Sequence, residues 1–376
     1  MKTLTTIIAV LTLLMGGGLV GQANASGLVD LPETGQTTCY DTDGNIIGCS
    51  GTGQDGDIQA GVEWPSPRFT DHGDGTVTDH LTGLMWTKDA NLPGGTKMWE
   101  EALEYAASLN NGSGTYGYTD WRLPNIKELE SIVDAERINP ALPQGHPFNN
   151  VQNNSWYWSA TTNDDMKTAA WILYLLTGQV DNQYKNTSHY VWPVRTGQTG
   201  TIRLPKTGQT TSYATGDDGD IQTGITWPSP RFTDHGDGTV TDNLTGLMWT
   251  KDTNLPGFQK TWQQALNYMA TLNTGGYTDW RLPNRKELLS LIDRSQSVNV
   301  LTEGHPFINL SAFHFWSSST RVYDTKYAWG IYIHNGGMSY GDKTSYYYVW
   351  PVRSGQVSPT TSTTPTTSRT TQTWPT

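Results

Sequence analysis

Apolar residues recur at helical spacing in two stretches of each half of the chain. In "TWQQALNYMATL", residues 261–272, the apolar positions share one helical face, and Thr261 and Gln264 fit a capping box. A second helix is expected after "WRLPN", where Asn125 or Asn284 fits the N-cap position. The side chains expected to face inward are Trp262, Ala265, Leu266, Met269 and Leu272, then Trp99, Ala102, Leu103, Ala106 and Leu109, and after the second helix start Leu129, Ile132 and Val133.

Apolar residues alternate at strand spacing near the end of each half. This alternation places one set of side chains on a core-facing side of a strand, and "HGDGT" supplies Asp and Gly for tight turns. Each half therefore reads as an α+β unit with two helices and an antiparallel β region. The core-facing set is Trp171, Leu173 and Leu175 in the first half and Trp329, Ile331 and Ile333 in the second.

The chain is an internal repeat. "WPSPRFTDHGDGTVTD" occurs at residues 64–79 and 227–242, "YTDWRLPN" at 118–125 and 277–284, and "YVWPVR" closes both copies. We therefore predict two tandem domains, residues 31–195 and 204–353, each large enough to bury its own core. The connection of residues 196–203 is short, so the two domains are expected to touch.

Both ends of the chain read as segments outside the fold. Residues 1–25 have a basic start, an apolar run and a small-x-small ending, as in a signal peptide, so we expect an exported protein located in the periplasm, on the cell surface or outside the cell. Residues 355–376 are rich in Thr, Ser and Pro and are expected to be disordered. No other run reaches the ~18 apolar residues of a membrane span.

The sequences "LPETG" and "LPKTG", residues 31–35 and 204–208, resemble sortase signals. Both precede a globular stretch, and the tail lacks the apolar segment that wall sorting requires, so we read each as an extended segment and turn.

The repeated motifs also resemble a known family. "RFTDHGDGTVTDNLTGLMWTKD", the helix led by Trp, "YTDWRLPN" and "VWPVR" are similar to the Lcl C-terminal domain family over nearly all of both copies. This resemblance implies a fold of the C-type-lectin group and binding at the cell surface, with sulfated glycans as ligands of the bacterial adhesin that gives the family its name. The collagen-like stalk of that adhesin is missing, because the chain has no Gly-x-y tract.

Sequence patterns do not indicate an enzyme. C-type lectins that bind sugars through calcium use Glu-Pro-Asn or Gln-Pro-Asp, where this chain has Leu-Pro-Asn, and Leu cannot ligate calcium. The start of the second helix also resembles formylglycine-generating enzymes, but the second copy lacks the cysteines that their chemistry needs. Residues 51–56, "GTGQDG", have no expected strand before them and no helix after them, so we read them as a flexible turn. His146 and His305 lack an oriented partner, and we name no catalytic residue.

Charge differs between the two copies. Residues 27–198 contain 9 Lys and Arg against 22 Asp and Glu, a net charge of −13, whereas residues 199–357 contain 13 of each. An acidic surface repels polyanions, so nucleic acid is excluded as a partner, and heparin-like glycans are disfavoured for the first copy and left open for the second.

We expect no cofactor, and calcium stays open as an alternative. None of the Asp clusters has the spacing of a known calcium loop, and turn formation explains the Asp-Gly pairs without a metal. The oxygen ligands that calcium would use are Asp71, Asp74, Asp79, Asp55 and Asp57 in the first copy and Asp234, Asp237, Asp242, Asp217, Asp218 and Asp220 in the second.

Aromatic residues indicate a candidate ligand face. The chain has 16 Trp and 18 Tyr against 7 Phe, but five Trp recur at equivalent points of both copies and read as a packing framework. The face opposite Trp329 and the segment after it carry flat rings and polar groups, including Lys343, without a dense single charge. The alternative is that these tyrosines only pack against the other repeat or lie in a loop. The candidate ligand-binding residues are Tyr332, His334, Tyr340, Asp342, Tyr346 and Tyr347.

The two cysteines are expected to form a disulfide. "CYDTDGNIIGC" predicts a hairpin with the loop Asp43, Gly44 and Asn45, in which Asn45 takes the left-handed conformation and Cys39 faces Cys49. Export would place the pair in an oxidising compartment.

From these patterns we expect a non-catalytic, adhesin-like protein that binds a glycan or a surface protein. A structural component of the envelope is the alternative, and an enzyme of unrecognised type is a weaker one.

Overall fold

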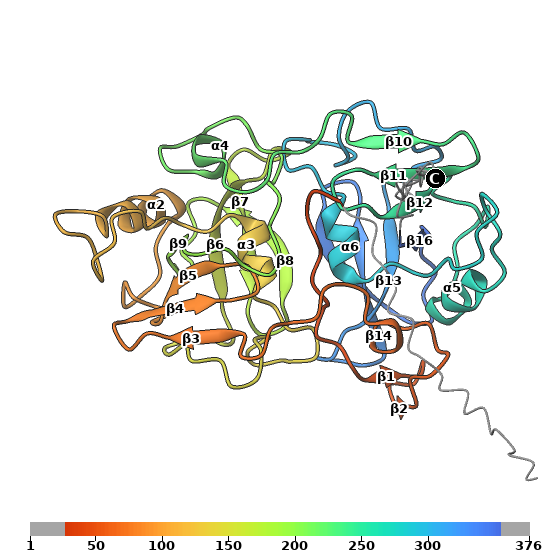
Figure 1. Ribbon diagram of the computed structural model, residues 1–376, viewed down its shortest axis with the longest axis horizontal. Helices are drawn as coiled ribbons and strands as arrows, with labels where there is room; N and C mark the ends of the chain where they lie inside the picture. Colours follow the sequence, from red (N-terminus) through yellow and green to blue (C-terminus); the bar gives the residue numbers. More distant parts are fainter. Residues whose placement is uncertain (1–26, 355–376) are drawn as a thin grey trace, which may run out of the picture.

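The computed structural model describes residues 27–354, which form two similar halves with small antiparallel sheets and few helices (Figure 1). We call residues 31–195 repeat 1 and residues 204–353 repeat 2. The α+β class predicted from the hydrophobic pattern is confirmed. The predicted signal peptide and the Thr-rich tail lie outside the described residues.

Repeat 1 contains two antiparallel sheets and two main helices. Its strands and helices are β3 Phe69–Asp71, β4 Thr76–Asp79, β5 Leu84–Thr87, α2 Trp99–Ser108, α3 Ile126–Ser131, β6 Trp156–Thr162, β7 Ala169–Tyr174, β8 Gln179–Tyr184 and β9 Val194–Thr196. The first sheet has the order β3-β4-β5-β9 and the second has the order β6-β7-β8. Because β9 pairs with β5, the end of the repeat returns to its beginning and closes the unit.

Repeat 2 has the same topology. Its elements are β10 Phe232–Asp234, β11 Thr239–Asp242, β12 Met248–Thr250, α5 Trp262–Met269, α6 Arg285–Ser290, β13 His314–Thr320, β14 Tyr327–Tyr332, β15 Gly337–Asp342 and β16 Val352–Arg353. The sheets have the orders β10-β11-β12-β16 and β13-β14-β15.

The helix starts follow the predicted capping signals. At α3, the Asn125 side chain accepts a hydrogen bond from the backbone N–H of Glu128, and the Glu128 carboxylate accepts one from the backbone N–H of Asn125. Asn284 and Glu287 repeat this box at α6, and Thr261 caps α5. These reciprocal bonds satisfy backbone donors that an uncapped helix end would leave free.

The predicted core faces are buried. The side chains of Trp329, Ile331 and Ile333 and their three repeat 1 counterparts are at most 1 % exposed. The five paired Trp of the packing framework are also buried, as predicted. The largest apolar cluster contains residues of both repeats, so the repeats touch through a shared core.

The first residues of each repeat cross over to the other repeat. We call residues 31–62 arm 1 and residues 204–225 arm 2. Arm 1 contains β1 Cys39–Tyr40, β2 Ile46–Ile47 and the one-turn helix α1 Asp55–Ile58, and arm 2 contains the one-turn helix α4 Asp218–Ile221. Asp55 accepts hydrogen bonds from Thr34 of its own arm (2.8 Å) and from Ser319 of repeat 2 (2.5 Å).

Arm 2 makes the same contacts in the reverse direction. Asp218 accepts hydrogen bonds from Thr207 of its own arm and Thr161 of repeat 1, both at 2.7 Å. The exchange is therefore reciprocal, and each repeat holds an arm that the other supplies. The sequence pattern predicted an extended segment and a turn here but did not predict the exchange.

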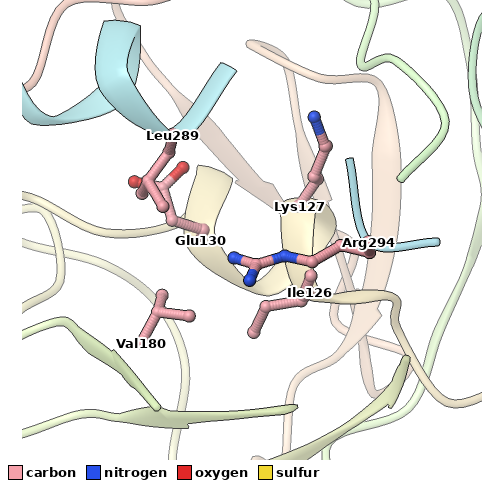
Figure 2. A pocket seen from close by; sticks show the side chains of 6 residues that line it. All are labelled: Ile126, Lys127, Glu130, Val180, Leu289 and Arg294. Carbon is pink, nitrogen blue, oxygen red and sulfur yellow. The ribbon is translucent and has the colours of Figure 1, made fainter. Parts of the chain in front are cut away.

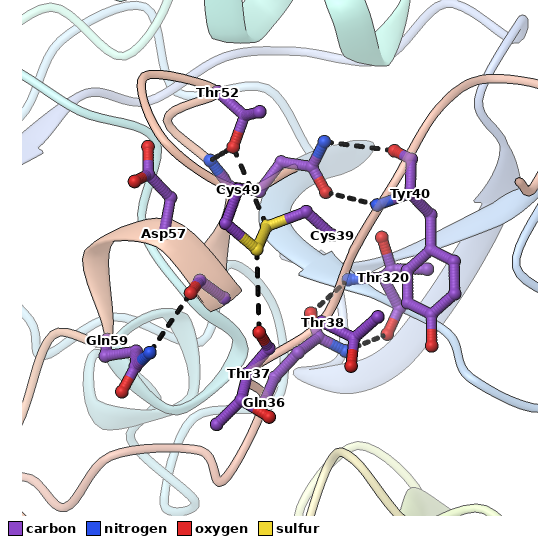
Figure 3. The surroundings of a disulfide bond; sticks show 12 residues. Gln36, Thr37, Thr38, Cys39, Tyr40, Cys49, Thr52, Asp57, Gln59 and Thr320 are labelled. Atoms are coloured by element: carbon purple, nitrogen blue, oxygen red, sulfur yellow. Dashed lines mark hydrogen bonds between the residues drawn. A yellow bond between two sulfur atoms is a disulfide. The ribbon is translucent and has the colours of Figure 1, made fainter. Parts of the chain in front are cut away.

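The side chain of one glutamine in each arm forms hydrogen bonds with the second sheet of the other repeat. The Gln36 side chain exchanges two hydrogen bonds with the backbone of Thr320 in β13 (Figure 3), and Gln209 does the same with Thr162 in β6. Thr34 and Thr207, the residues after which a sortase would cut, are each 1 % exposed and lie within these contacts.

The disulfide between Cys39 and Cys49 is present (Figure 3). The predicted hairpin register is wrong, however, because Cys39 pairs with Ile47 and the loop spans residues 41–45. Gly44, not Asn45, takes the left-handed conformation, since Asp41 accepts bonds from the backbone N–H of Asn45 and fixes that residue in another conformation.

The segment "GTGQDG" also differs from its prediction. The short strand β2 precedes it, and its last residues begin α1 instead of ending in a flexible turn. The Gln54 side chain bonds both the N–H and the carbonyl of Tyr40, which fixes the turn in place. The short apolar run before it and the single helical turn after it gave no periodic signal in the sequence.

Candidate functional site

A row of stacked rings lies on the face of the second sheet of repeat 2 opposite Trp329, and it runs from the half-buried Tyr332 to the fully buried Trp316. The register pairs His314 of β13 with Tyr332 of β14, which puts both side chains on the face opposite Trp329. The ring centroids of Tyr332 and His314 are 4.7 Å apart with an interplanar angle of 25°. Tyr347 stacks on the other side of His314 at 4.9 Å and then on Trp316 at 4.2 Å. We call these four residues the aromatic stack of repeat 2.

Glycine makes room for this stack. A Cβ atom at Gly341 would lie 2.6 Å from the ring of Tyr347, so only glycine lets the ring lie flat on β15. Nδ1 of His314 is 2.8 Å from the Ser339 hydroxyl, and burial lowers the pKa of His314 below its ordinary value. The imidazole is therefore neutral at pH 7 and stacks as an uncharged ring.

Repeat 1 has rings at the same positions but not a continuous stack. Trp156 stacks on Tyr174 with centroids 4.5 Å apart, whereas His189 meets Trp158 edge-on at 75°. Burial lowers the pKa of His189 to about 4. Because His189 stands where repeat 2 has Tyr347, the row is interrupted in repeat 1.

The structure brings some of the predicted site residues together and separates others. Tyr332 and Tyr347 lie in the stack, and the His334 ring lies 5.7 Å from that of Tyr332. Tyr346 is 60 % exposed beside Tyr347. Asp342 ends β15, where hydrogen bonds from Thr344 lower the pKa of its carboxyl.

Tyr340 lies on the other face of the sheet. It pairs with Trp329 across β14 and β15, so its ring points to the core-facing side at the sheet edge. The guanidinium of Arg321 lies 4.0 Å from the Tyr340 ring centroid and 4.8 Å from that of Tyr323. Arg321, Tyr323 and Tyr340 form a second cluster, which repeat 1 replaces with Asn163, Asp165 and Asn182.

Lys343, expected on the ligand face, is buried instead. Its Nζ atom donates to the backbone carbonyls of Tyr40 and Asp41 in arm 1 and lies 4.1 Å from the Trp262 ring centroid. Burial lowers the pKa of Lys343 to about 7. This lysine therefore fastens the disulfide hairpin to repeat 2 and is not available to a ligand.

Sequence reasoning missed His314 as a member of the stack, whereas it placed Trp316 correctly in the buried packing framework. Both lie on β13, and their alternation with Phe315 was the available signal. It could be used only with the pairing of β13 and β14, which places His314 beside Tyr332.

The acidic residues considered as calcium ligands serve other contacts. Asp71 forms an ion pair with Lys88 at 2.6 Å, Asp74 accepts bonds from Thr76, and Asp79 pairs with the buried Arg68. Across residues 27–354, no three His, Cys, Asp or Glu side chains come together in a group that could hold a metal ion. The histidines of the "GHPF" segments pack beside Phe148 and Phe307.

The fold and these surfaces define a tandem protein built from two equivalent α+β domains. The chain belongs to the Lcl C-terminal domain family, which matches residues 75–195 and 238–353, together more than half of its length. Both matched segments begin after the arms. No curated protein matches the chain. Within the described part, no helix has the length and apolar character that crossing a membrane requires.

Proposed function

We propose that this protein is an exported, non-catalytic, adhesin-like binding protein with a C-type-lectin-like fold. It would hold a glycan or a protein partner at the cell surface or in the periplasm. The observation that carries the proposal is the aromatic stack of repeat 2, in which three half-buried rings lie next to the buried Trp316.

The chemistry of the stack supports binding. Tyr332, His314 and Tyr347 are half-buried, so each ring is held by its neighbours and still has exposed surface. Rings fixed in this way lose little entropy when a sugar ring or an apolar side chain packs on them. The exposed Tyr346 and the nearby His334 add polar groups that can orient such a ligand.

Export has independent support. The leader-like residues 1–25 indicate secretion, and the Cys39–Cys49 disulfide is typical of an oxidising compartment. The acidic surface of repeat 1 favours repeat 2 as the side that meets a negatively charged glycan or cell surface.

Binding is tested with a glycan array and a pull-down from surface extracts, using the full chain. Tyr332→Ala, Tyr340→Ala and Tyr346→Ala together are expected to leave the melting temperature unchanged and to weaken binding roughly 30-fold, as for the loss of contact residues at the centre of an interface. Tyr184→Ala, an exposed tyrosine of repeat 1, is the matched control.

Separate variants then distinguish binding by the aromatic stack from binding by the Arg321 cluster. Tyr332→Ala with Tyr346→Ala should account for the loss if the stack binds, whereas Tyr340→Ala alone should account for it if the Arg321 cluster binds. Undiminished binding in the triple variant would place the site elsewhere. A wild-type chain that binds neither glycans nor surface proteins would instead favour a structural role in the envelope.

A further inference from the structure

Helices α3 and α6 lie on either side of the middle of the molecule (Figure 1), and residues of both line a small cavity between the two repeats. The cavity has a volume of about 20 Å³, enough for one or two water molecules. Repeat 1 supplies four of the lining residues and repeat 2 supplies two. They are Ile126, Lys127, Glu130 and Val180, with Leu289 and Arg294 (Figure 2).

Two buried arginines of repeat 2 reach across this boundary. Arg285 is 0 % exposed and donates a hydrogen bond to the carbonyl of Gly178 in repeat 1. Arg294 is 4 % exposed, and its guanidinium lies 3.8 Å from the ring centroid of Trp171 in repeat 1. In the described structure, neither guanidinium comes within ion-pair distance of a carboxylate.

Glu130 is the shared opposing charge. Glu130 lines the same cavity as Arg294 (Figure 2), and its Oε1 atom is shielded from solvent without a hydrogen-bond partner. Burial lowers the pKa of Arg285, of Lys286 and of Arg294, and the charge of Glu130 is the first influence that opposes the lowering in all three. Glu130 of repeat 1 and Arg294 of repeat 2 thus line one cavity with opposite charges, without forming an ion pair.

These charges are not equivalent in the two repeats. The segment "RLPNIKELESIVDAE" of repeat 1 aligns without gaps with "RLPNRKELLSLIDRS" of repeat 2. Ile126 corresponds to Arg285, Glu130 to Leu289 and Ala135 to Arg294. The lysine between the first two positions is common to both repeats, as Lys127 and Lys286. The acid is therefore present on one side only, and both arginines are present on the other.

We propose that this boundary is an interaction surface that accepts only the unlike repeat. The surface of α3 and β8 in repeat 1 fits a partner that carries two arginines, which is repeat 2 of the same chain or of a second copy. Two repeat 2 surfaces placed together would bury four arginines without the acid. Two repeat 1 surfaces would place two glutamates beside two copies of Lys127 and would lose the contacts of both arginines with Gly178 and Trp171. The first pairing leaves buried charges uncompensated and the second loses contacts across the boundary, so both oppose pairing of like repeats.

This selectivity affects how the two arms are exchanged. Both arms share the same Thr, Asp and hydroxyl contacts, and these contacts alone do not distinguish a repeat from its twin. Arm 1 adds the disulfide hairpin, which Lys343 of repeat 2 binds. The charges at the cavity do distinguish the two repeats. Together with the short connection of residues 196–203, they keep the exchange within one chain and oppose linkage of chains through like repeats.

The test uses the full chain and makes the two surfaces identical. Glu130→Leu is combined with Arg285→Ile and Arg294→Ala, so that both repeats carry the same three residues. Glu130→Leu alone and the double arginine variant alone are the two partial changes. Glu104→Leu, on the exposed side of α2, controls for a Glu to Leu change on a helix.

Each partial change should lower the melting temperature by at least ~4 °C, because it leaves buried charges uncompensated. The combined variant should recover at least half of the summed loss. After refolding from denaturant, light scattering should show dimers that increase with concentration for the combined variant, and monomers for the wild type. Additive losses, or the same distribution of species for both proteins, would overturn the proposal.

Discussion

Repeat 1 and repeat 2 use the same buried groups to begin their second helices, and they differ in the side chains that face solvent or each other. Arg122 pairs with Glu128 at 2.6 Å, and Arg281 pairs with Glu287 at 2.5 Å, both largely buried. Both sheets bury the same Trp positions. By contrast, the aromatic stack, the Arg321 cluster and the disulfide hairpin each occur in one repeat only.

This difference separates the residues that fix the backbone, which we call the shared frame, from the residues of the candidate binding surface. Residues that fix the backbone are the same in both copies because a change there would disturb an entire unit. Residues outside this frame differ, and they give repeat 1 its acidic charge and repeat 2 its continuous aromatic stack. Under the proposed function, binding is expected mainly from repeat 2, to which repeat 1 supplies an arm that carries a disulfide.

The largest effect on stability is expected from loss of the buried Arg–Glu pair at the start of the second helix, which both repeats contain. Glu287→Ala should lower the free energy of unfolding by about 3–5 kcal/mol, because Arg281 would stay buried without its partner and the backbone N–H of Asn284 would lose its acceptor. Glu128→Ala should produce a similar loss in repeat 1. Denaturant unfolding measures both.

The exposed Glu303→Ala is the control for this pair and should change stability little. Losses that differ strongly between Glu128→Ala and Glu287→Ala would show that the two frames are not energetically equivalent.

A smaller effect is expected from the disulfide, which only arm 1 contains. Cys39→Ser with Cys49→Ser should lower the free energy of unfolding by about 2–3 kcal/mol, since the unfolded chain gains freedom. Hydrogen exchange should become faster in arm 1 and stay unchanged in arm 2, where Ser212 replaces the first cysteine. Two alkylatable thiols in the native wild-type protein would contradict the assignment.

The smallest effect concerns pH and should be equal in both arms. Burial raises the pKa of Asp55 and of Asp218 to about 6, although hydrogen bonds from hydroxyl groups oppose the rise. Since this value exceeds the ordinary 3.8, the folded state favours the protonated form. The stabilising contribution is therefore complete below pH ~4 and is lost as the pH rises through about 6.

Asp55→Asn keeps the acceptor oxygen and removes the charge. It should raise the free energy of unfolding by about 1–2 kcal/mol at pH 8 and change it little at pH 4, and Asp218→Asn should behave alike. Denaturation at the two pH values measures this. Destabilisation by the same amount at both pH values would show that the charge is not the source of the effect.

Several features could be predicted from the sequence because neighbouring residues encode them. The capping boxes at Asn125 and Asn284 use residues three positions apart, and the buried face that includes Trp329 follows from alternation along one strand. The left-handed Gly44 was missed because the hairpin register depends on the whole loop. In the candidate site, Tyr332 and Tyr347 were identified, whereas Tyr340 was placed with them although strand pairing turns it to the other face.

The sequence by itself determined the two repeats, their helices and strands, their core faces and the cysteine pair, because each depends on local spacing or on literal repetition. The tertiary structure decided three further features: the exchange of the arms, the stacking of His314 between Tyr332 and Tyr347, and the placing of Glu130 and Arg294 on one cavity. Each joins residues far apart in the chain. Their contacts are set by strand pairing and by the packing of one repeat on the other, which no local pattern specifies.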